Sequence, residues 1–251
     1  MLNLRKRKDH SMSYLKYISD KILKEIVENV IQIGMDSKEN ANESFYDNVI
    51  DPFAALIECS AFDVTPSDWK SSEMIRQSQK TLQNHIGELH QKILGSVRGW
   101  EDLGVGEQID LVCNERKIIA EIKNKYNTVT GGKLSDQYHT LENLVSQKAS
   151  KYKGYKAYFV TIIPSKRERF DIPFTPSDKS KGQKCPISED IRIIDGSSFY
   201  KIATGRDEAL KELFSALPKV IEDVLSKGSK KKTFKKNEIE VFLDYFNRAF
   251  N

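Results

Sequence analysis

Two acidic residues and a lysine are placed where they could support metal-assisted hydrolysis of a phosphodiester bond. Asp110 belongs to one short apolar run, and Glu121 and Lys123 belong to the next. Carboxylate oxygens are ligands that Mg²⁺ prefers, and the bound ion keeps some of its waters and accepts phosphate oxygens. The ion lowers the pKa of a bound water, and a neighbouring lysine can stabilise the negative charge that develops during the reaction.

The spacing of these three residues predicts that they lie on one face of a β-hairpin. Residues 109–113 and 117–123 have the pattern of two strands with a tight polar turn between them. Side chains alternate along a strand, so Glu121 and Lys123 share a face. A turn of even length, formed by residues 115–116 or 114–117, places Asp110 opposite Glu121. A turn of odd length without a bulge would separate the two carboxylates and abolish the site.

The Asp/Glu-x-Lys pattern is weak evidence by itself, because it occurs four times in this sequence. The other three examples begin at Asp36, Asp68 and Glu115, in a polar loop, near a helix start and in the expected turn. Only Glu121 and Lys123 lie inside an apolar run, where charges are unfavourable unless they are paired or bound to a metal ion. A structural Glu–Lys pair on an exposed face of the sheet is the alternative interpretation.

A longer match around these residues resembles the PD-(D/E)xK nucleases. It comprises residues 106–110, Gly-Glu-Gln-Ile-Asp, and residues 120–128, Ala-Glu-Ile-Lys-Asn-Lys-Tyr-Asn-Thr. More narrowly, the Glu-Ile-Lys-Asn-Lys-x-Asn-Thr run resembles a group of type II restriction endonucleases that recognise GGNCC. The similarity covers about residues 85–200. Ile109 stands where the motif name has a proline, a position that such enzymes keep only loosely.

The resemblance implies Mg²⁺-dependent cleavage of both strands of DNA at a short, near-palindromic site, leaving 5′-phosphates. It implies that Asp110 and Glu121 hold the metal ion, with the backbone carbonyl of Ile122 as a further ligand. Lys123 would be the catalytic lysine. Such nucleases often take another acidic residue from the preceding helix, and Glu88 is the candidate here. A solvated glutamate on a helix face is the alternative interpretation of Glu88.

Basic and polar residues beyond the catalytic strand are expected to contact DNA, because phosphate contacts come largely from lysine and arginine. The candidates that follow the strand directly are Lys125, Asn127, Thr128 and Lys133. Arginine is the usual bidentate reader of guanine, so Arg167 and Arg169 are candidates for reading G·C pairs. The alternative is a solvated loop in which Glu168 pairs with an arginine.

The elements that must position these residues follow the order of an α/β protein. Hydrophobic periodicity predicts helices over residues 13–33, 53–62, 69–94, 134–150, 206–225 and 237–250. Apolar runs predict strands over residues 109–113, 117–123, 157–163 and 191–195. Pro66 or Ser67 is in range to cap the helix over residues 69–94, and Gly95 is a natural end for it.

We expect a restriction-endonuclease-like α/β core, with a central mixed β-sheet flanked by helices and with helical additions at both ends. The chain, residues 1–251, is expected to form a single nuclease domain. Within it we expect an N-terminal helical region over residues 1–84, a catalytic core over 85–200 and a C-terminal helical region over 201–251.

The composition agrees with a DNA-binding protein of a reducing compartment. The 251 residues are 30% charged, and the formal net charge of +4 is mildly basic, which is compatible with a nucleic-acid partner without requiring one. No apolar stretch is long enough to span a membrane, and the basic start lacks the apolar segment of a secretory signal. We therefore expect a cytoplasmic protein. No P-loop or GxGxxG motif suggests a nucleotide cofactor.

A zinc site is not expected. The three cysteines are far apart in the sequence and form no CxxC motif. No histidine has a second histidine or a cysteine at the spacing of zinc ligands.

The leading hypothesis is a type II restriction endonuclease that cleaves double-stranded DNA. Palindromic sites match a two-fold symmetric dimer, so we expect a homodimer. Two alternatives stay open at this point. One is a DNA-repair or junction-resolving nuclease with the same core, and the other is a non-catalytic DNA-binding module whose sheet keeps the charges for stability.

Overall fold

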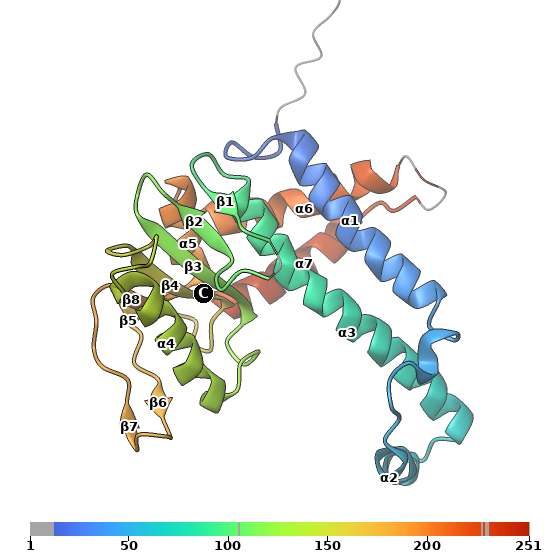
Figure 1. Ribbon diagram of the computed structural model, residues 1–251. Coiled ribbons are helices and arrows are strands. Elements are labelled where there is room, and N and C mark those ends of the chain that lie inside the picture. The colour runs from blue at the N-terminus through green and yellow to red at the C-terminus, as the bar shows by residue number, and fades with distance from the viewer. Residues whose placement is uncertain (1–12, 105, 227, 229–230, 251) are drawn as a thin grey trace, which may run out of the picture.

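The computed structural model describes residues 13–104, 106–226, 228 and 231–250 (Figure 1). Within this part of the chain, six strands form one mixed sheet in the order β1-β2-β3-β4-β8-β5. Their bounds are β1 Glu101–Asp102, β2 Leu111–Cys113, β3 Ile118–Lys125, β4 Lys156–Ile163, β5 Asp171–Pro173 and β8 Ile191–Asp195. Strands β3, β4 and β8 run parallel, whereas β1, β2 and β5 are antiparallel to their neighbours. The expected mixed sheet is confirmed.

Helices cover both faces of this sheet. Their bounds are α1 Asp20–Glu39, α2 Pro52–Phe62, α3 Pro66–Gly95, α4 Gly131–Ser146, α5 Gly196–Thr204, α6 Ala209–Leu225 and α7 Lys236–Phe250, with a 3₁₀ turn at Ser44–Tyr46. A separate hairpin consists of β6 Ser177–Asp178 and β7 Gln183–Lys184. Helix α4 and this hairpin lie on one side of the sheet, and α3, α5, α6 and α7 lie on the other (Figure 1).

The central strands bury apolar side chains on both faces. Ala120 and Ile122 of β3 belong to a core shared with α1, α3, α5 and α6. Ile119 belongs to a second core with Tyr138 and Leu141 of α4. Parallel strands covered on both faces are apolar along their whole length. Glu121 is therefore a charged residue within an otherwise apolar and buried stretch.

Helices α1 and α3 pack side by side and extend beyond the sheet as a helical arm, with α2 at its far end (Figure 1). Helix α3 has 30 residues, which corresponds to about 45 Å at the usual rise per residue. Its C-terminal part contacts β1, β2 and β3. Helix α3 therefore connects the sheet to the far end of the arm without interruption. It also crosses the boundary between residues 84 and 85, where we expected the N-terminal helical region to end.

The starts of α1, α3 and α6 differ from the sequence-based expectations, and α6 begins at Ala209 and not at residue 206. Helix α1 begins at Asp20, not at residue 13, because Ser19 caps it. Thr65, rather than Pro66 or Ser67, caps α3, since the Thr65 side chain accepts a hydrogen bond within the first turn. Proline occupies the first helical position of α3, where its missing N–H is no disadvantage.

Gly95 ends α3, as expected from the sequence. It is the last helical residue, and Ser96 is the C-cap. A Cβ atom at Gly95 would lie 2.8 Å from the backbone nitrogen of Asp102. The glycine therefore allows β1 to approach the end of α3 closely.

Two further helix differences lie after β3. Helix α5 was not expected, although Asp195 caps it by accepting a hydrogen bond from the N–H of Ser198. Helix α4 begins at Gly131 and ends at Ser146, so it is shifted towards the N-terminus relative to residues 134–150. Among the helices of the described residues, none is long and apolar enough to cross a membrane.

Candidate active site

Strands β2 and β3 form the antiparallel hairpin that the residue spacing predicts. Leu111 pairs with Ala120, and Cys113 pairs with Ile118. Residues 114–117 form the turn between them. The even length of the turn is confirmed, and this register directs Asp110 towards Glu121.

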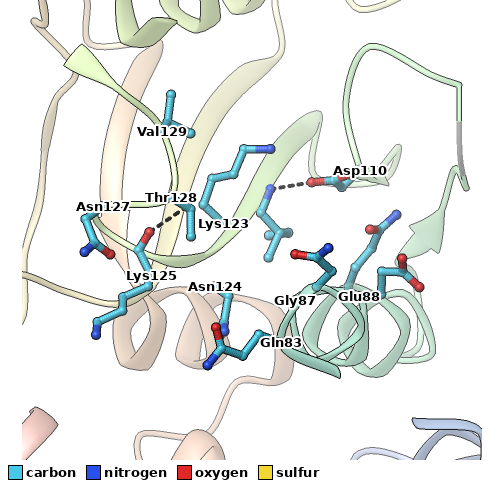
Figure 2. A pocket seen from close by; sticks show the side chains of 13 residues that line it. Gln83, Gly87, Glu88, Asp110, Lys123, Asn124, Lys125, Asn127, Thr128 and Val129 are labelled. Atoms are coloured by element: carbon cyan, nitrogen blue, oxygen red, sulfur yellow. Dashed lines mark hydrogen bonds between the residues drawn. The ribbon is translucent and has the colours of Figure 1, made fainter. Parts of the chain in front are cut away.

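Asp110 lies one residue before β2 and is held against β3 by two hydrogen bonds. Its backbone N–H donates to the carbonyl of Ala120 at 3.0 Å. Its carboxylate Oδ2 accepts a hydrogen bond from the N–H of Ile122 at 2.6 Å (Figure 2). The N–H and C=O of one residue point to the same edge of a strand. The carbonyl of Ile122 therefore points to the edge of β3 at which Asp110 lies.

Glu121 and Lys123 share the other part of this site. Glu121 is only 8% exposed. The Lys123 Nζ donates a hydrogen bond to Glu121 Oε1 at 2.5 Å. By the alternation of side chains, both residues lie on the same face of β3 as Ile119, which packs in the core with α4. The side chains of Glu121 and Lys123 are 11% and 27% exposed.

Burial and a neighbouring negative charge disfavour the ionised form of both carboxylates, the neighbour being Asp102 for Asp110 and Asp110 for Glu121. Burial raises the pKa of Asp110, and the hydrogen bond from the Ile122 N–H acts in the opposite direction. Burial and then the negative charge of Asp110 raise the pKa of Glu121, while Lys123 opposes both effects. A divalent cation between the carboxylates would remove this repulsion, because it supplies the positive charge that one lysine only partly provides. The donors are all oxygens, which suits Mg²⁺.

A polar cavity of about 720 Å³ lies between the C-terminal half of α3 and the end of β3 (Figure 2). It is lined by Gln83, Asn84, Gly87, Glu88, Gln91, Asp110, Ile122, Lys123, Asn124, Lys125, Asn127, Thr128 and Val129. The cavity lining includes Asp110 and Lys123, which were expected at the catalytic site. It also includes three of the expected DNA-contacting residues, Lys125, Asn127 and Thr128. Glu121 is not part of the lining and meets it through its ion pair with Lys123.

Glu88 projects from α3 at this cavity (Figure 2). Its carboxylate lies 3.1 Å from Nδ1 of His85 and 3.7 Å from Nζ of Lys92, and its side chain is 42% exposed. The position allows a role in the cavity. The two neighbours on the same helix also give Glu88 the contacts of an ordinary surface glutamate.

The other expected DNA-contacting residues lie outside the cavity lining. Lys133 is exposed in the first turn of α4, and Arg167 is exposed in the loop after β4. Arg169 is paired with Glu208 at 3.0 Å and also donates to the carbonyl of Asp207. Arg169 therefore pairs with a residue at the start of α6. The alternative interpretation named Glu168 as the partner of an arginine, and for Arg169 this is wrong.

Gln91 and Asp102 are cavity neighbours that the sequence analysis missed. The Gln91 Nε2 donates to Asp102 Oδ1 at 2.7 Å. Asp102 is close enough to contribute to the raised pKa of Asp110. No motif identifies either residue, because the connection depends on β1 packing against α3.

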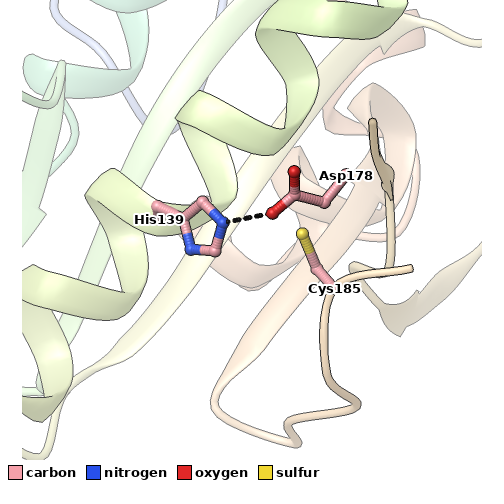
Figure 3. Close-up of side chains that lie close together, drawn as sticks. All are labelled: His139, Asp178 and Cys185. Carbon is pink, nitrogen blue, oxygen red and sulfur yellow. Dashed lines mark hydrogen bonds and ion pairs between the residues drawn. The ribbon is translucent and has the colours of Figure 1, made fainter. Parts of the chain in front are cut away.

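A second polar cluster lies between α4 and the β6–β7 hairpin (Figure 3). The ring nitrogens of His139 lie 3.0 Å from Asp178 Oδ2 and 3.2 Å from Glu142 Oε2, and the Cys185 thiol is nearby. Asp178 Oδ1 accepts hydrogen bonds from the N–H and the hydroxyl of Ser180. Both carboxylate oxygens of Asp178 are thus occupied. Its ion pair with His139 connects the β6–β7 hairpin to α4.

Hydrogen bonds within this cluster favour the charged forms of His139 and Asp178. Hydrogen bonds with Asp178 and Glu142 raise the pKa of His139. Hydrogen bonds from Ser180 and then from His139 lower the pKa of Asp178. A protonated histidine between two carboxylates accounts for the arrangement without a metal ion.

A mixed sheet with two carboxylates and a lysine on adjacent strands, next to a polar cavity, defines a nuclease of the restriction-endonuclease-like fold. The chain belongs to the Eco47II restriction endonuclease family, whose family model matches residues 15–226. This membership also confirms the resemblance stated from the sequence.

Two curated relatives are similar over nearly the whole chain. The type II restriction enzyme Eco47II of Escherichia coli is 51% identical over 239 residues, which are 95% of this chain and 100% of the relative. The type II restriction enzyme Sau96I of Staphylococcus aureus is 30% identical over 240 residues, which are 94% of this chain and 89% of the relative. The protein is accordingly a type II restriction endonuclease, a site-specific deoxyribonuclease that acts on double-stranded DNA.

Proposed function

We propose that the enzyme hydrolyses both strands of DNA at GGNCC in a Mg²⁺-dependent reaction that leaves 5′-phosphates. The observation that carries this proposal is the cluster of a half-buried carboxylate, a buried carboxylate and a lysine, Asp110, Glu121 and Lys123, at the end of a polar cavity. GGNCC is proposed because residues 120–128 resemble the enzymes that recognise it.

In this proposal Asp110 and Glu121 hold the Mg²⁺ ion, and the carbonyl of Ile122 is a third ligand. When bound, the ion supplies a water of lowered pKa and stabilises negative charge on the phosphate. The hydrogen bond from the Ile122 N–H keeps the Asp110 carboxylate in a fixed orientation. Such preorganisation matters because a ligand that must first be ordered contributes less to catalysis.

Lys123 has two roles in the proposal. Its ammonium group, which contacts Glu121 at 2.5 Å, stays on the carboxylate side of the strand. From there it donates a hydrogen bond to the attacking water and stabilises negative charge at the scissile phosphate. Glu88 is proposed as an additional acidic residue that orients this water from α3.

The DNA duplex is proposed to enter along the cavity between α3 and the end of β3. Lys125, Asn127 and Thr128 would contact the backbone beside the scissile phosphate, and Lys133 would contact a phosphate farther along. Arg167 is exposed and suited to reading a G·C pair. Arg169 would first have to leave Glu208, so we propose that it reads a base only after this ion pair opens.

We also propose that the enzyme works as a homodimer in the cytoplasm, where it meets incoming DNA. The described residues of one chain provide one such catalytic cluster, whereas a near-palindromic site presents two equivalent strands. The chain is proposed to act as one nuclease domain, because α3 links the arm to the catalytic sheet without interruption.

Digestion of a plasmid of known sequence tests this function. Wild-type enzyme, Lys123→Ala and the matched surface control Lys148→Ala would each be incubated with Mg²⁺ or with EDTA. We expect discrete bands for the wild type and the control with Mg²⁺, and intact DNA for Lys123→Ala and for every sample in EDTA. Sequencing of the fragment ends would identify the recognition site and the position of the 5′-phosphate.

Other outcomes of this digestion would contradict specific parts of the proposal. A smear would favour the repair or junction-resolving nuclease. Intact DNA in every lane would favour a binding module. Discrete bands that Lys123→Ala still produces would show that the catalytic lysine is a different residue.

A further inference from the structure

Helix α2 has the sequence of a buried helix in an exposed place. Among its residues, all of which are described, none is buried. The helix lies at the far end of the arm (Figure 1). Its large apolar residues Phe53, Leu56, Ile57 and Phe62 are 65–76% exposed. Its more covered side, towards α3, has only small residues such as Ala54 and Ala55. Helix α2 therefore contacts the arm through small side chains and through the Glu58–Trp69 hydrogen bond, and it leaves its largest apolar side chains in solvent.

Phe53, Leu56 and Ile57 lie on one face of α2, and together with Tyr46 and Val49 they make up what we call the arm-tip surface. From the usual area of such side chains, their exposed surface is on the order of 800 Å². The largest apolar patch on an ordinary monomer is roughly 300–600 Å². A stable protein–protein interface buries about 800 Å² on each partner. The arm-tip surface thus has the size of an interface and exceeds that of an incidental patch.

The charge of α2 disfavours DNA and membranes as partners of this surface, although Lys70 of α3 lies over the ring of Tyr46. Helix α2 contains no lysine or arginine. Its charged residue Glu58 accepts a hydrogen bond from the Trp69 side chain, and both its caps, Asp51 and Asp63, are acidic. Acidic groups repel phosphates, and helices that lie on membranes usually have basic residues on their polar face. An apolar protein surface is the remaining kind of partner.

We propose that the arm-tip surface is the subunit interface of this enzyme, where α2 of one chain packs against α2 of a second copy. A two-fold contact brings the same residues of both chains together. A surface with few charges is suited to this, because like charges would otherwise meet across the axis. The choice of a second copy as the partner rests on the proposed function, which needs two catalytic centres for two strands.

The position of the surface gives the interface a consequence for catalysis. Helix α3 carries the arm tip at one end and the cavity residues Gln83, Gly87 and Glu88 near the other. A contact between arm tips therefore sets the separation of the two catalytic centres through one continuous helix.

The molar mass in solution tests this interface. Wild-type protein, Leu56→Glu and Ile57→Glu would be compared by sedimentation velocity over a range of concentrations, with circular dichroism as the check on folding. Ile187→Glu is the matched control, because Ile187 is also exposed but lies in the loop between β7 and β8. We expect a dimer for the wild type and for the control, and a twofold lower molar mass for both α2 variants.

Cross-linking locates the contact independently of stability. Cys113 and Cys185 are buried, so a Cys59→Ser background leaves no readily accessible thiol among the free cysteines. In this background, Leu56→Cys should form a covalent dimer with a short bis-maleimide, whereas Ile187→Cys should not. A monomeric wild type, or α2 variants that stay dimeric and do not cross-link, would overturn the interface.

These results are separate from the test of the proposed function. An enzyme that cuts DNA at a specific site but keeps its dimer in Leu56→Glu would contradict the interface alone. A protein that loses its dimer in Leu56→Glu but never cuts DNA would support the interface and contradict the proposed function.

Discussion

At the scale of single residues, the site combines charges that are unfavourable apart from a cation. Asp110 is half-buried and Glu121 is buried, and each has a raised pKa. One lysine, Lys123, neutralises part of this charge. Residues selected for stability alone would not be arranged in this way, because replacing one carboxylate by a neutral group would relieve the repulsion.

Glu121→Gln should therefore separate activity from stability. We expect DNA cleavage to fall about 100-fold or more, because a charged ligand is lost at the reacting centre. In EDTA, we expect the Tm near neutral pH to be unchanged or to rise by up to about 3 °C. A carboxyl with a raised pKa opposes folding when it is ionised, so the gain should disappear as the pH falls through that pKa.

Glu115→Gln is the control for this substitution, since Glu115 is exposed in the turn of the same hairpin. Cleavage assays and thermal unfolding would be measured on both variants. A Tm several degrees below that of the wild type for Glu121→Gln would instead favour a structural Glu–Lys pair.

The His139 cluster predicts a second dependence on pH. The raised pKa of His139 means that its pairing stabilises the fold fully below the usual histidine pKa of about 6.5, and that this contribution is lost as the pH rises through the raised value. The lowered pKa of Asp178 means that the contribution is also lost in acid. The Tm difference between wild type and His139→Gln should thus be largest near pH 5.5 and smaller near pH 9, both values being approximate.

His85→Gln is the comparison for this measurement, because His85 contacts one partly exposed carboxylate and not two. A Tm difference for His139→Gln that is the same at both pH values would show that the histidine is neutral in the folded protein. Stability would then come from packing.

At the scale of elements, the ends of helices and strands decide how the cavity is assembled. The cavity is formed where the last turns of α3 meet β3. The close approach of β1 to Gly95 belongs to the same contact, because Gln91 of α3 bonds to Asp102 of β1. The position of α3 relative to the sheet is therefore set by a glycine that has no role in chemistry.

Gly95→Ala should weaken this contact. The added Cβ would lie 2.8 Å from the Asp102 nitrogen, which is backbone and cannot move freely. We expect the free energy of unfolding to fall by about 1–3 kcal/mol, as for other overpacked sites. Chemical denaturation would measure this change.

Gly87→Ala is the control on the same helix, because its Cβ would meet only the Asn124 side chain at an ordinary 3.7 Å. That substitution should raise the free energy of unfolding by about 0.5–1 kcal/mol, since alanine favours a helix interior. Equal destabilisation by both substitutions would contradict the role of the close approach.

At the scale of the whole molecule, the arm and the sheet have different tasks. The sheet, packed between its two cores, carries the residues that we propose as catalytic. The arm extends from this body and ends in an apolar helix that the body does not cover. A second chain packed against α2 would cover these apolar side chains, which is the arrangement that we propose for the active enzyme.

Mixed dimers test the division of labour between two chains. A dimer of one wild-type and one Lys123→Ala chain, co-expressed and purified by two different tags, should cut only one strand at each binding event. Supercoiled plasmid would then be converted to open circles, whereas wild-type dimers would produce linear DNA. Linear DNA as the first product of the mixed dimer would show that one catalytic centre cuts both strands.

The sequence alone was sufficient for the local features of this protein. Alternation along the strands and the even turn at residues 114–117 determine the hairpin register, because both are properties of neighbouring residues. The apolar strands at 157–163 and 191–195 were identifiable for the same reason. The motif at 120–128 was specific enough to indicate the family, which the comparisons confirm.

Only the tertiary structure decided the features that depend on distant segments. It brought Gln91 to Asp102, and His139 to Asp178, although the members of the second pair are 39 positions apart. It also showed that α2 is uncovered, which an apolar sequence cannot reveal, because buried and interface helices have the same composition. Such contacts are set by how whole elements pack, and no local pattern of residues records that packing.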